Sequence, residues 1–286
     1  MDIVLNVFDD AFFDKLYFGL LERGDGLRQL LSLYFIVTIG GAILYLILAT
    51  LSYHLIFDKS LMKHKRFIKS QRFLEIVTSL INIPKMAIPT ALIFWLQVRG
   101  YGKLYDNISE YGYLYWILSI FLFILWSDMA IYWIHRWLHH PIFYSRFHKP
   151  HHKWLVPTPF ASHAFHWLDG FSQSSPYHMF IFMLPLHKWT YLVLFVFVNI
   201  WSVSIHDGLD LVPNCFQNIL NGSAHHTDHH LHFNYNYGQF FTLWDFVGKS
   251  HRDPHVGELS IMEKDLIRTE IPEEESELLQ HLNKND

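Results

Sequence analysis

The chain has 286 residues, 51% of them hydrophobic, and a formal net charge of −4 at pH 7; its mean hydropathy is positive, which is unusual for a water-soluble protein. The acidic balance, without a basic stripe interleaved with aromatic residues, excludes nucleic acid as a partner. The single cysteine, Cys215, excludes a disulfide framework and any metal site built from several thiolates, so a metal here would need nitrogen or oxygen ligands.

The first apolar segment covers residues 30–51 and carries no charged side chain. A helix of this length crosses the roughly 30 Å hydrocarbon layer of a bilayer, so we predict a membrane-spanning helix. The acidic residues before it, 1–29, lack the basic n-region of a signal peptide. We expect them to remain on the mature chain as a luminal N-terminal segment.

Two further apolar segments cover residues 76–98 and 113–134, and Pro84 and Pro89 predict a kink in the first of these. The loop before them, FDKSLMKHKRFIKSQR, carries six Lys or Arg residues against one Asp. Positively charged loops remain in the cytosol. We therefore assign this loop to the cytosol, and the third helix then delivers His135 to the cytosolic side.

The fourth apolar region, residues 177–205, is interrupted by Pro185, His187 and Lys188. A single crossing here would leave the histidine-rich segments before and after it on opposite faces of the bilayer. We therefore predict that residues 171–205 enter the membrane and return, as a helical hairpin or a re-entrant element.

Together these segments predict an all-α integral membrane protein with about four transmembrane or re-entrant helices. Transmembrane helices 1–3 lie within residues 30–134, and a cytosolic, histidine-rich cap holds a dimetal site. Residues 257–286 are acidic and lack an apolar face long enough to dock, which indicates a mobile cytosolic tail.

Three groups of histidines have the spacing of metal ligands on a helix. Residues three or four apart lie on one helical face, about one turn apart, where two rings can bind the same ion. The groups supply more ligands than one ion uses, and so many ionisable rings beside a membrane are costly unless something binds them. They are His135 and His139; His148, His151 and His152; and His226, His229 and His230.

Other side chains near these groups are candidate additional ligands or outer partners. A carboxylate that accepts the free N–H of a ligating ring fixes its tautomer and raises its basicity. Asp128 precedes His135 by two helical turns, Asp228 lies within HHTDHH, and Asp210 is considered both as an outer partner and as a direct ligand. The full set of these candidates is His140, His166, His206, His225, Asp128, Asp210 and Asp228.

Ligation by nitrogen alone suits zinc, iron or copper, and zinc has no redox chemistry. The residues by themselves therefore leave open whether the site hydrolyses or oxidises its substrate. The chain contains no GxGxxG and no CxxCH motif, so it has no visible means of taking electrons directly from a nicotinamide cofactor.

The sets HRWLHH, HKPHH and HHTDHH follow one another at the ends of apolar helices. In this order they resemble the three histidine boxes of the membrane sterol desaturase and fatty acid hydroxylase superfamily. The segments KPHHKWLVPTPFASHAFH, FVNIWSVSIHDG and NGSAHHTDHHLHFNYNYGQFFTLWD are similar to the sterol C5-desaturases within it. The similarity covers nearly the whole chain except the tail, with a catalytic domain at residues 120–256.

This resemblance implies a di-iron oxidoreductase, a multi-pass protein of the endoplasmic reticulum membrane with its active site on the cytosolic side. It implies a reaction that uses dioxygen, with electrons from NADH relayed by cytochrome b5 and its reductase. The product is the C5–C6 double bond of a Δ7-sterol, as in the conversion of lathosterol to 7-dehydrocholesterol. By the family motif, the implied metal ligands are His135, His139, His140, His148, His151, His152, His206, His226, His229 and His230.

Three other interpretations share some of these features. A C4-methylsterol oxidase or a fatty acid hydroxylase of the same superfamily would share the metal site and differ in substrate. A histidine-rich metal transporter would carry its histidines along a path at mid-membrane or in flexible loops, whereas these lie in aromatic-rich segments at helix ends. A bis-histidine haem protein needs about two rings per haem and leaves most of these histidines unexplained.

Overall fold

The computed structural model describes residues 1–209 and 212–254. The predicted tail, 257–286, and the candidate Asp210 lie outside the described residues. Within the described ranges the fold is almost wholly helical, with two short strands, β1 (Leu104–Tyr105) and β2 (Leu186–His187). The prediction of an all-α membrane protein is confirmed by this architecture and by the long apolar helices described next.

Three helices are long and apolar enough to cross a membrane: α3 (Gly26–Leu55), α4 (Gln71–Leu96) and α5 (Gly112–Leu138). Helices α3 and α5 contain predicted spans 30–51 and 113–134, and the span 76–98 covers most of α4 and the start of the turn that follows it. Asp25 caps α3 by accepting hydrogen bonds from the backbone N–H groups of Leu27 and Arg28. Helix α4 runs on through Pro84 and Pro89 and passes into a π-helical turn, Gln97–Tyr101.

Helix α3 shows how the sequence pattern fits a lipid environment. Every fourth residue along one face is a large apolar side chain that is exposed, whereas a helix of a water-soluble protein places such a stripe inward. The exposed stripe is Leu31, Phe35, Ile39, Ile43, Ile47 and Leu51. The interior side of the bundle is packed instead by fully buried rings such as Phe123 of α5 and Phe180 of α7.

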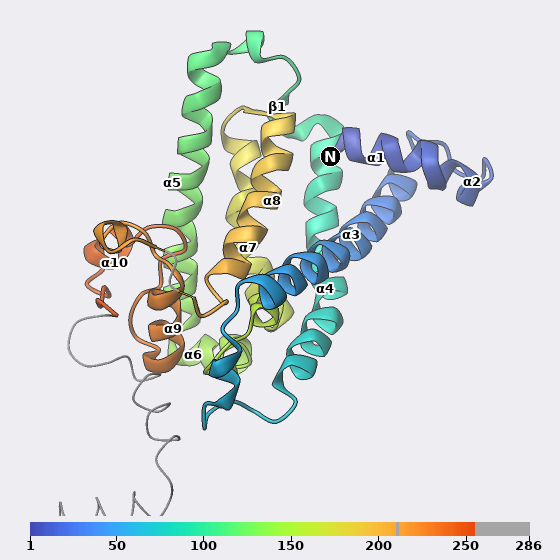
Figure 1. Cartoon of the computed structure of the whole chain (residues 1–286). Helices are drawn as coiled ribbons and strands as arrows, with labels where there is room; N and C mark the ends of the chain where they lie inside the picture. The colour runs from blue at the N-terminus through green and yellow to red at the C-terminus, as the bar shows by residue number, and fades with distance from the viewer. Residues whose placement is uncertain (210–211, 255–286) are drawn as a thin grey trace, which may run out of the picture.

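The fourth apolar region forms the predicted hairpin. Helix α7 (Trp167–Met183) and helix α8 (Lys188–Ser204) are joined at residues 184–187, where the sequence interrupts the apolar run. The connection contains β2, which pairs in parallel with β1 in the loop before α5. The tip of the hairpin therefore lies at the end of the bundle opposite α6 (Pro141–Phe143) and α9 (Ser223–His232) (Figure 1).

The N-terminal residues also lie near the β1 end of the bundle (Figure 1). They form α1 (Asp2–Phe8), a π-helical turn (Asp9–Phe13) and α2 (Asp14–Tyr17). The buried guanidinium of Arg28 binds the Asp9 carboxylate at 2.8 Å, which ties this segment to the start of α3.

Short elements cover the other end of the bundle (Figure 1). They are α6 (Pro141–Phe143), a π-helical turn (Tyr144–His148), a 3₁₀ turn (Pro159–His163), α9 (Ser223–His232) and α10 (Leu243–Val247); further 3₁₀ turns cover Lys59–Lys63, Ile108–Glu110 and Asn214–Phe216.

A buried carboxylate fixes one of these segments to the bundle. Glu75 of α4 accepts a hydrogen bond from the Thr158 hydroxyl and another, at 2.7 Å, from the Gln71 amide. Gln71 also donates to the backbone oxygen of Val156 at 2.8 Å, and the Tyr45 hydroxyl donates to that of Phe160 at 2.9 Å. The segment after the second histidine set is thereby held against α3 and α4.

Candidate metal centre

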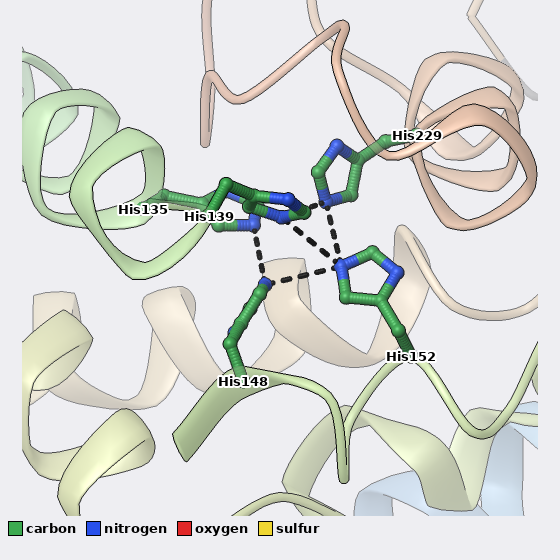
Figure 2. A group of neighbouring side chains, drawn as sticks. All are labelled: His135, His139, His148, His152 and His229. Atoms are coloured by element: carbon green, nitrogen blue, oxygen red, sulfur yellow. Dashed lines mark hydrogen bonds between the residues drawn. The ribbon is translucent and has the colours of Figure 1, made fainter. Parts of the chain in front are cut away.

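The structure gathers nine histidines into two buried groups. In the first group, α5 contributes His135 and the adjoining His139, the turn that follows contributes His148 and His152, and α9 contributes His229. One ring nitrogen from each of these histidines lies within 4.8 Å of those of the other four, and Figure 2 shows the five rings converging. The second group contains four rings at the same spacing, His151, His206, His226 and His230.

Each of the last two sequence sets is divided between the two groups. On α9, His226 and His230 are one turn apart and face the second group, whereas His229 faces the first. In the turn at residues 148–152, His148 and His152 again pair at a spacing of four, and His151 faces the other way. The two groups therefore share the same two short backbone segments.

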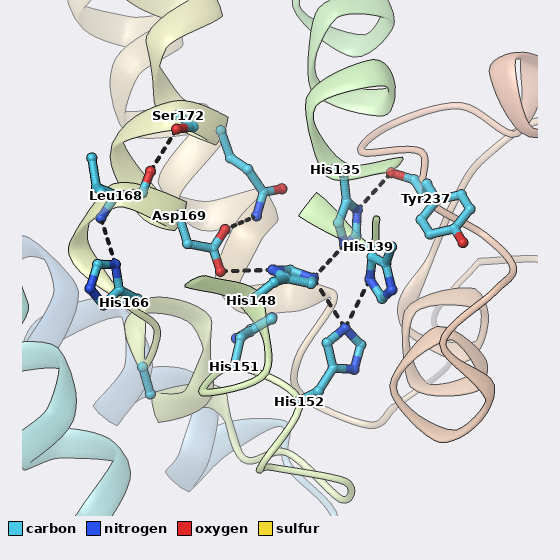
Figure 3. A network of polar contacts seen from close by, with 12 residues as sticks. His135, His139, His148, His151, His152, His166, Leu168, Asp169, Ser172 and Tyr237 are labelled. Carbon is cyan, nitrogen blue, oxygen red and sulfur yellow. Dashed lines mark hydrogen bonds and ion pairs between the residues drawn. The ribbon is translucent and has the colours of Figure 1, made fainter. Parts of the chain in front are cut away.

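Outer partners set the tautomer of four of these rings. The Nδ1–H of His135, His229 and His206 donates to the backbone oxygens of Tyr237, Tyr235 and Ser202, at 3.0, 2.7 and 2.6 Å. The Nδ1–H of His148 donates to Asp169 at 2.8 Å (Figure 3). Because a neutral imidazole has one N–H, each of these rings directs an unprotonated Nε2 inward.

Inward-facing Nε2 atoms lie too close together for a site without a cation. His135 and His148 place theirs 3.1 Å apart, and His206 lies 3.0 Å from His226. The two lone pairs of His135 and His148 repel each other at this distance, so that contact is not an ordinary hydrogen bond. Nitrogens bound to one metal at about 2.1 Å and at right angles are about 3.0 Å apart, so the spacing matches the edge of a coordination shell.

Burial keeps the rings neutral, as metal ligands must be. Loss of hydration, and then the neighbouring rings, lower the pKa values of His226 and His230 well below the usual range. The same causes act on the pKa values of His151 and His152. Burial lowers the pKa of His206 to about 4. At neutral pH their lone pairs are free for a metal.

Three candidate histidines lie outside both groups. The His140 ring accepts a hydrogen bond from the backbone of Ile142 and caps α6, and the His166 ring caps α7 by accepting from Leu168. His225 is buried, 5.9 Å from the ring of His251. On α9, one residue's offset turns a side chain by about 100°, so His225 faces away from its neighbour His226.

Asp128 and Asp228, two of the aspartates singled out from the sequence, bind groups other than the histidine rings of the two groups. Asp128 accepts hydrogen bonds from the backbone N–H groups of Phe240 and Phe241 rather than from a ligand. Asp228 accepts from Asn236 at 3.2 Å and lies 3.5 Å from Arg252. Backbone N–H groups therefore bind Asp128, and the side chains of Asn236 and Arg252 bind Asp228.

Sequence reasoning missed the carboxylate that does bind a ligand of the first group. Asp169 lies in the first turn of α7, is fully buried, and accepts from His148 and, at 2.7 Å, from the amide of Gln173. It belongs to none of the three histidine sets in the sequence. Its place in FHWLDG, directly after the second set and at a helix start, is the one signal that could have singled it out.

An apolar cavity of about 380 Å³ opens beside both groups. It runs between α3, α4, α7 and α8, and its wall includes His135 of the first group and His151, His206 and His226 of the second. Farther along α7 and α8 the wall includes His178, whose ring lies 2.9 Å from the Tyr191 hydroxyl. Its size and apolar lining suit a small lipophilic molecule.

Comparisons with known proteins agree with this centre. Residues 120–250 match the family model described as fatty acid hydroxylase. The chain is 51% identical to the lathosterol oxidase of Mus musculus over 257 residues, covering 89% of this chain and 86% of the relative. It is 50% identical to a Delta(7)-sterol 5(6)-desaturase of Schizosaccharomyces pombe over 286 residues, covering 95% and 94%. No solved structure matches the chain.

Proposed function

Because the chain belongs to the fatty acid hydroxylase family, we propose that its two histidine groups hold two iron ions and that it introduces the C5–C6 double bond of Δ7-sterols. The sterol activity is that of the relatives which are about half identical over most of their length. It converts lathosterol, or a related Δ7-sterol, to the Δ5,7-diene.

The observation that carries this proposal is the cavity that reaches both histidine groups. It is apolar, enclosed by membrane helices, and open to rings of each group. A sterol is itself a lipid of the bilayer, so a cavity between membrane helices can receive it without passage through water. An ion-transport path would instead need polar groups along its length.

The chain's own residues hold and shape the centre. Nine imidazole nitrogens supply the ligands, which would be His135, His139, His148, His152 and His229 for one ion and His151, His206, His226 and His230 for the other. Asp169 and three backbone oxygens keep the donor atoms inward. When bound, the two irons supply the reduction of dioxygen that makes removal of hydrogen from an unactivated carbon feasible.

We place the catalytic centre on the cytosolic side of the endoplasmic reticulum membrane. The basic loop between α3 and α4 lies at the same end of the bundle as α6 and α9 (Figure 1), and the positive-inside rule assigns that end to the cytosol. Electrons would reach it from NADH through cytochrome b5 and its reductase, because the chain has no dinucleotide motif of its own. Residues 120–256 form the catalytic domain.

Sterol profiling tests the proposal. The chain is expressed in cells that lack their own sterol C5-desaturase, and sterols are measured by gas chromatography and mass spectrometry. The intact chain is expected to convert the accumulated Δ7-sterol to the Δ5,7-diene, and His226→Ala and His230→Ala are expected to abolish this conversion. His225→Ala is the matched control, since its ring lies in the same helix but outside both groups.

The same experiment separates the alternatives. Loss of C4-methylsterols, or appearance of hydroxylated fatty acids, would assign the chain to another activity of the superfamily. An intact, well-expressed chain that leaves the Δ7-sterol unchanged would refute the proposed reaction. Two irons per purified chain, lost on exchange of the histidines, would support the metal assignment independently of turnover.

A further inference from the structure

We propose that Gln173 binds the C3 hydroxyl of the sterol and so sets which carbons face the metal centre. This inference rests on the proposed function, because it takes the substrate to be a sterol that loses hydrogens from C5 and C6. It names a positioning residue that neither the family match nor the histidine pattern identifies.

The orientation of the Gln173 amide is fixed by its partner. Its Nε2 lies 2.7 Å from Oδ1 of Asp169, and a carboxylate can only accept hydrogen bonds. The amide nitrogen must therefore face Asp169, and the amide oxygen must face away from it. Gln173 lines the cavity, and no residue that the structure describes donates to its Oε1. The oxygen is a hydrogen-bond acceptor without a partner among the described residues, in a wall that is mainly apolar.

The position of this acceptor relative to the centre agrees with the geometry of a sterol. Asp169 joins Gln173 to His148, so one carboxylate and one imidazole ring separate the amide from the first group of ligands. In a sterol, three single bonds of about 1.5 Å separate the C3 oxygen from C5, which places these atoms within about 4 Å of each other. When C5 and C6 face the centre, the hydroxyl must lie beside it too.

Two other polar pairs line the cavity, His163 with Asn199 and His178 with Tyr191, and the members of each are already bonded to each other. The second pair also lies too far along the bundle for this role. His178 comes nine residues after Asp169 on α7, which is about 13 Å farther along the helix axis at 1.5 Å per residue. That end of the cavity suits the apolar chain on C17 of the sterol, which extends away from the hydroxyl.

Paired substrates isolate the proposed hydrogen bond. The enzyme, loaded with iron and supplied with its electron donors, is assayed with a Δ7-sterol and with the analogue that has hydrogen in place of the C3 hydroxyl. The ratio of their kcat/KM values is the readout. Incomplete metal loading lowers both values equally and leaves the ratio unchanged, so a merely structural role of Gln173 would not move it.

We expect the intact chain to prefer the hydroxylated sterol by about tenfold or more in kcat/KM. The analogue loses one neutral hydrogen bond and leaves the amide oxygen of Gln173 without a donor. Gln173→Met, which keeps the length of the side chain but has no amide, is expected to bring the ratio close to one. Gln173→Leu should do the same and serves if the first variant does not fold. Ser175→Ala, on the same helix but outside the cavity lining, should retain the ratio.

The outcomes are distinct. A ratio that stays high in Gln173→Met and Gln173→Leu would overturn the inference, and so would an intact chain that does not discriminate. A ratio that collapses in Tyr191→Phe but not in the Gln173 variants would place the hydroxyl at the far end and overturn it as well. An intact chain that desaturates neither substrate would instead refute the proposed function.

Discussion

His148 and Asp169 are joined by a 2.8 Å hydrogen bond between two side chains that are both fully buried. The carboxylate holds the ring so that its Nε2 faces the other rings of the first group. A carboxylate in this position also raises the basicity of the ligand, and loss of such a partner costs about 10- to 100-fold in metal affinity.

We therefore expect Asp169→Ala to weaken iron binding by about 10- to 100-fold, because the His148 ring loses the partner that fixes its tautomer. Titration of the purified protein with a chelator, followed by metal analysis, measures the change. Asp228→Ala is the control, since Asp228 contacts Asn236 and Arg252. Equal iron retention in both variants would contradict the assigned role of Asp169.

Neighbouring histidines of α9 are expected to affect different ions. His229 belongs to the first group and His230 to the second, so His229→Ala and His230→Ala should each lower the iron content toward one ion per chain. The two variants should differ in the spectroscopic signature of the remaining iron, which Mössbauer spectra of the purified proteins would record. Identical spectra from the two variants would mean that the two rings do not serve separate ions. The control variant, His225→Ala, should retain two irons per chain.

Removal of the metal should make stability depend on pH. The folded-state pKa values of His226 and His230 lie well below the usual range because the rings are buried, whereas in the unfolded chain they are about 6.5. Below pH 6.5 the unfolded chain binds protons that the folded chain does not, so stability falls as pH falls, by about 1.4 kcal/mol per pH unit for each such histidine.

Thermal unfolding of the metal-free protein in detergent, between pH 7.5 and 5.5, measures this effect. We expect the midpoint to fall across that interval. A midpoint that does not change with pH would show that the rings are not buried in a neutral form. The iron-loaded protein is the reference, since bound metal stabilises the folded state.

The Thr158 hydroxyl is expected to contribute to stability through Glu75. Thr158→Val keeps the size of the side chain but removes a donor to a buried carboxylate, which should cost about 1.5–3 kcal/mol in the free energy of unfolding. Thermal unfolding in detergent provides the measurement. Thr78→Val, on the helix α4 that carries Glu75, is the matched control. An equal loss of stability in both variants would argue against the buried network.

The sequence predicted the membrane helices well because their signal is local. Length and lack of charge identify a span without knowledge of its neighbours, and the interruption at Pro185 to Lys188 predicted the hairpin for the same reason. The spacing of four between His135 and His139, and between His226 and His230, likewise predicted pairs that converge on one ion.

The division of the histidines between two groups could not be predicted in this way. The first and last rings of HKPHH face one group and the middle ring faces the other, which depends on how the turn packs against α5 and α9. Asp169 was missed because contact with His148 arises only when α7 folds back beside α5. Asp128 was misassigned because a spacing of two turns places two side chains on one face but does not select their partners.

Helix α9 sets the spacing between its histidines of the two groups. The ten residues of this helix carry histidines of both groups, so the separation of these rings is set by the pitch of a single backbone and not by a flexible connecting loop. The backbone positions of His226, His229 and His230 cannot move apart unless this helix unwinds. The two irons proposed for this centre would thus lie at a spacing set by the helix, and the sterol proposed as substrate would meet them at that spacing.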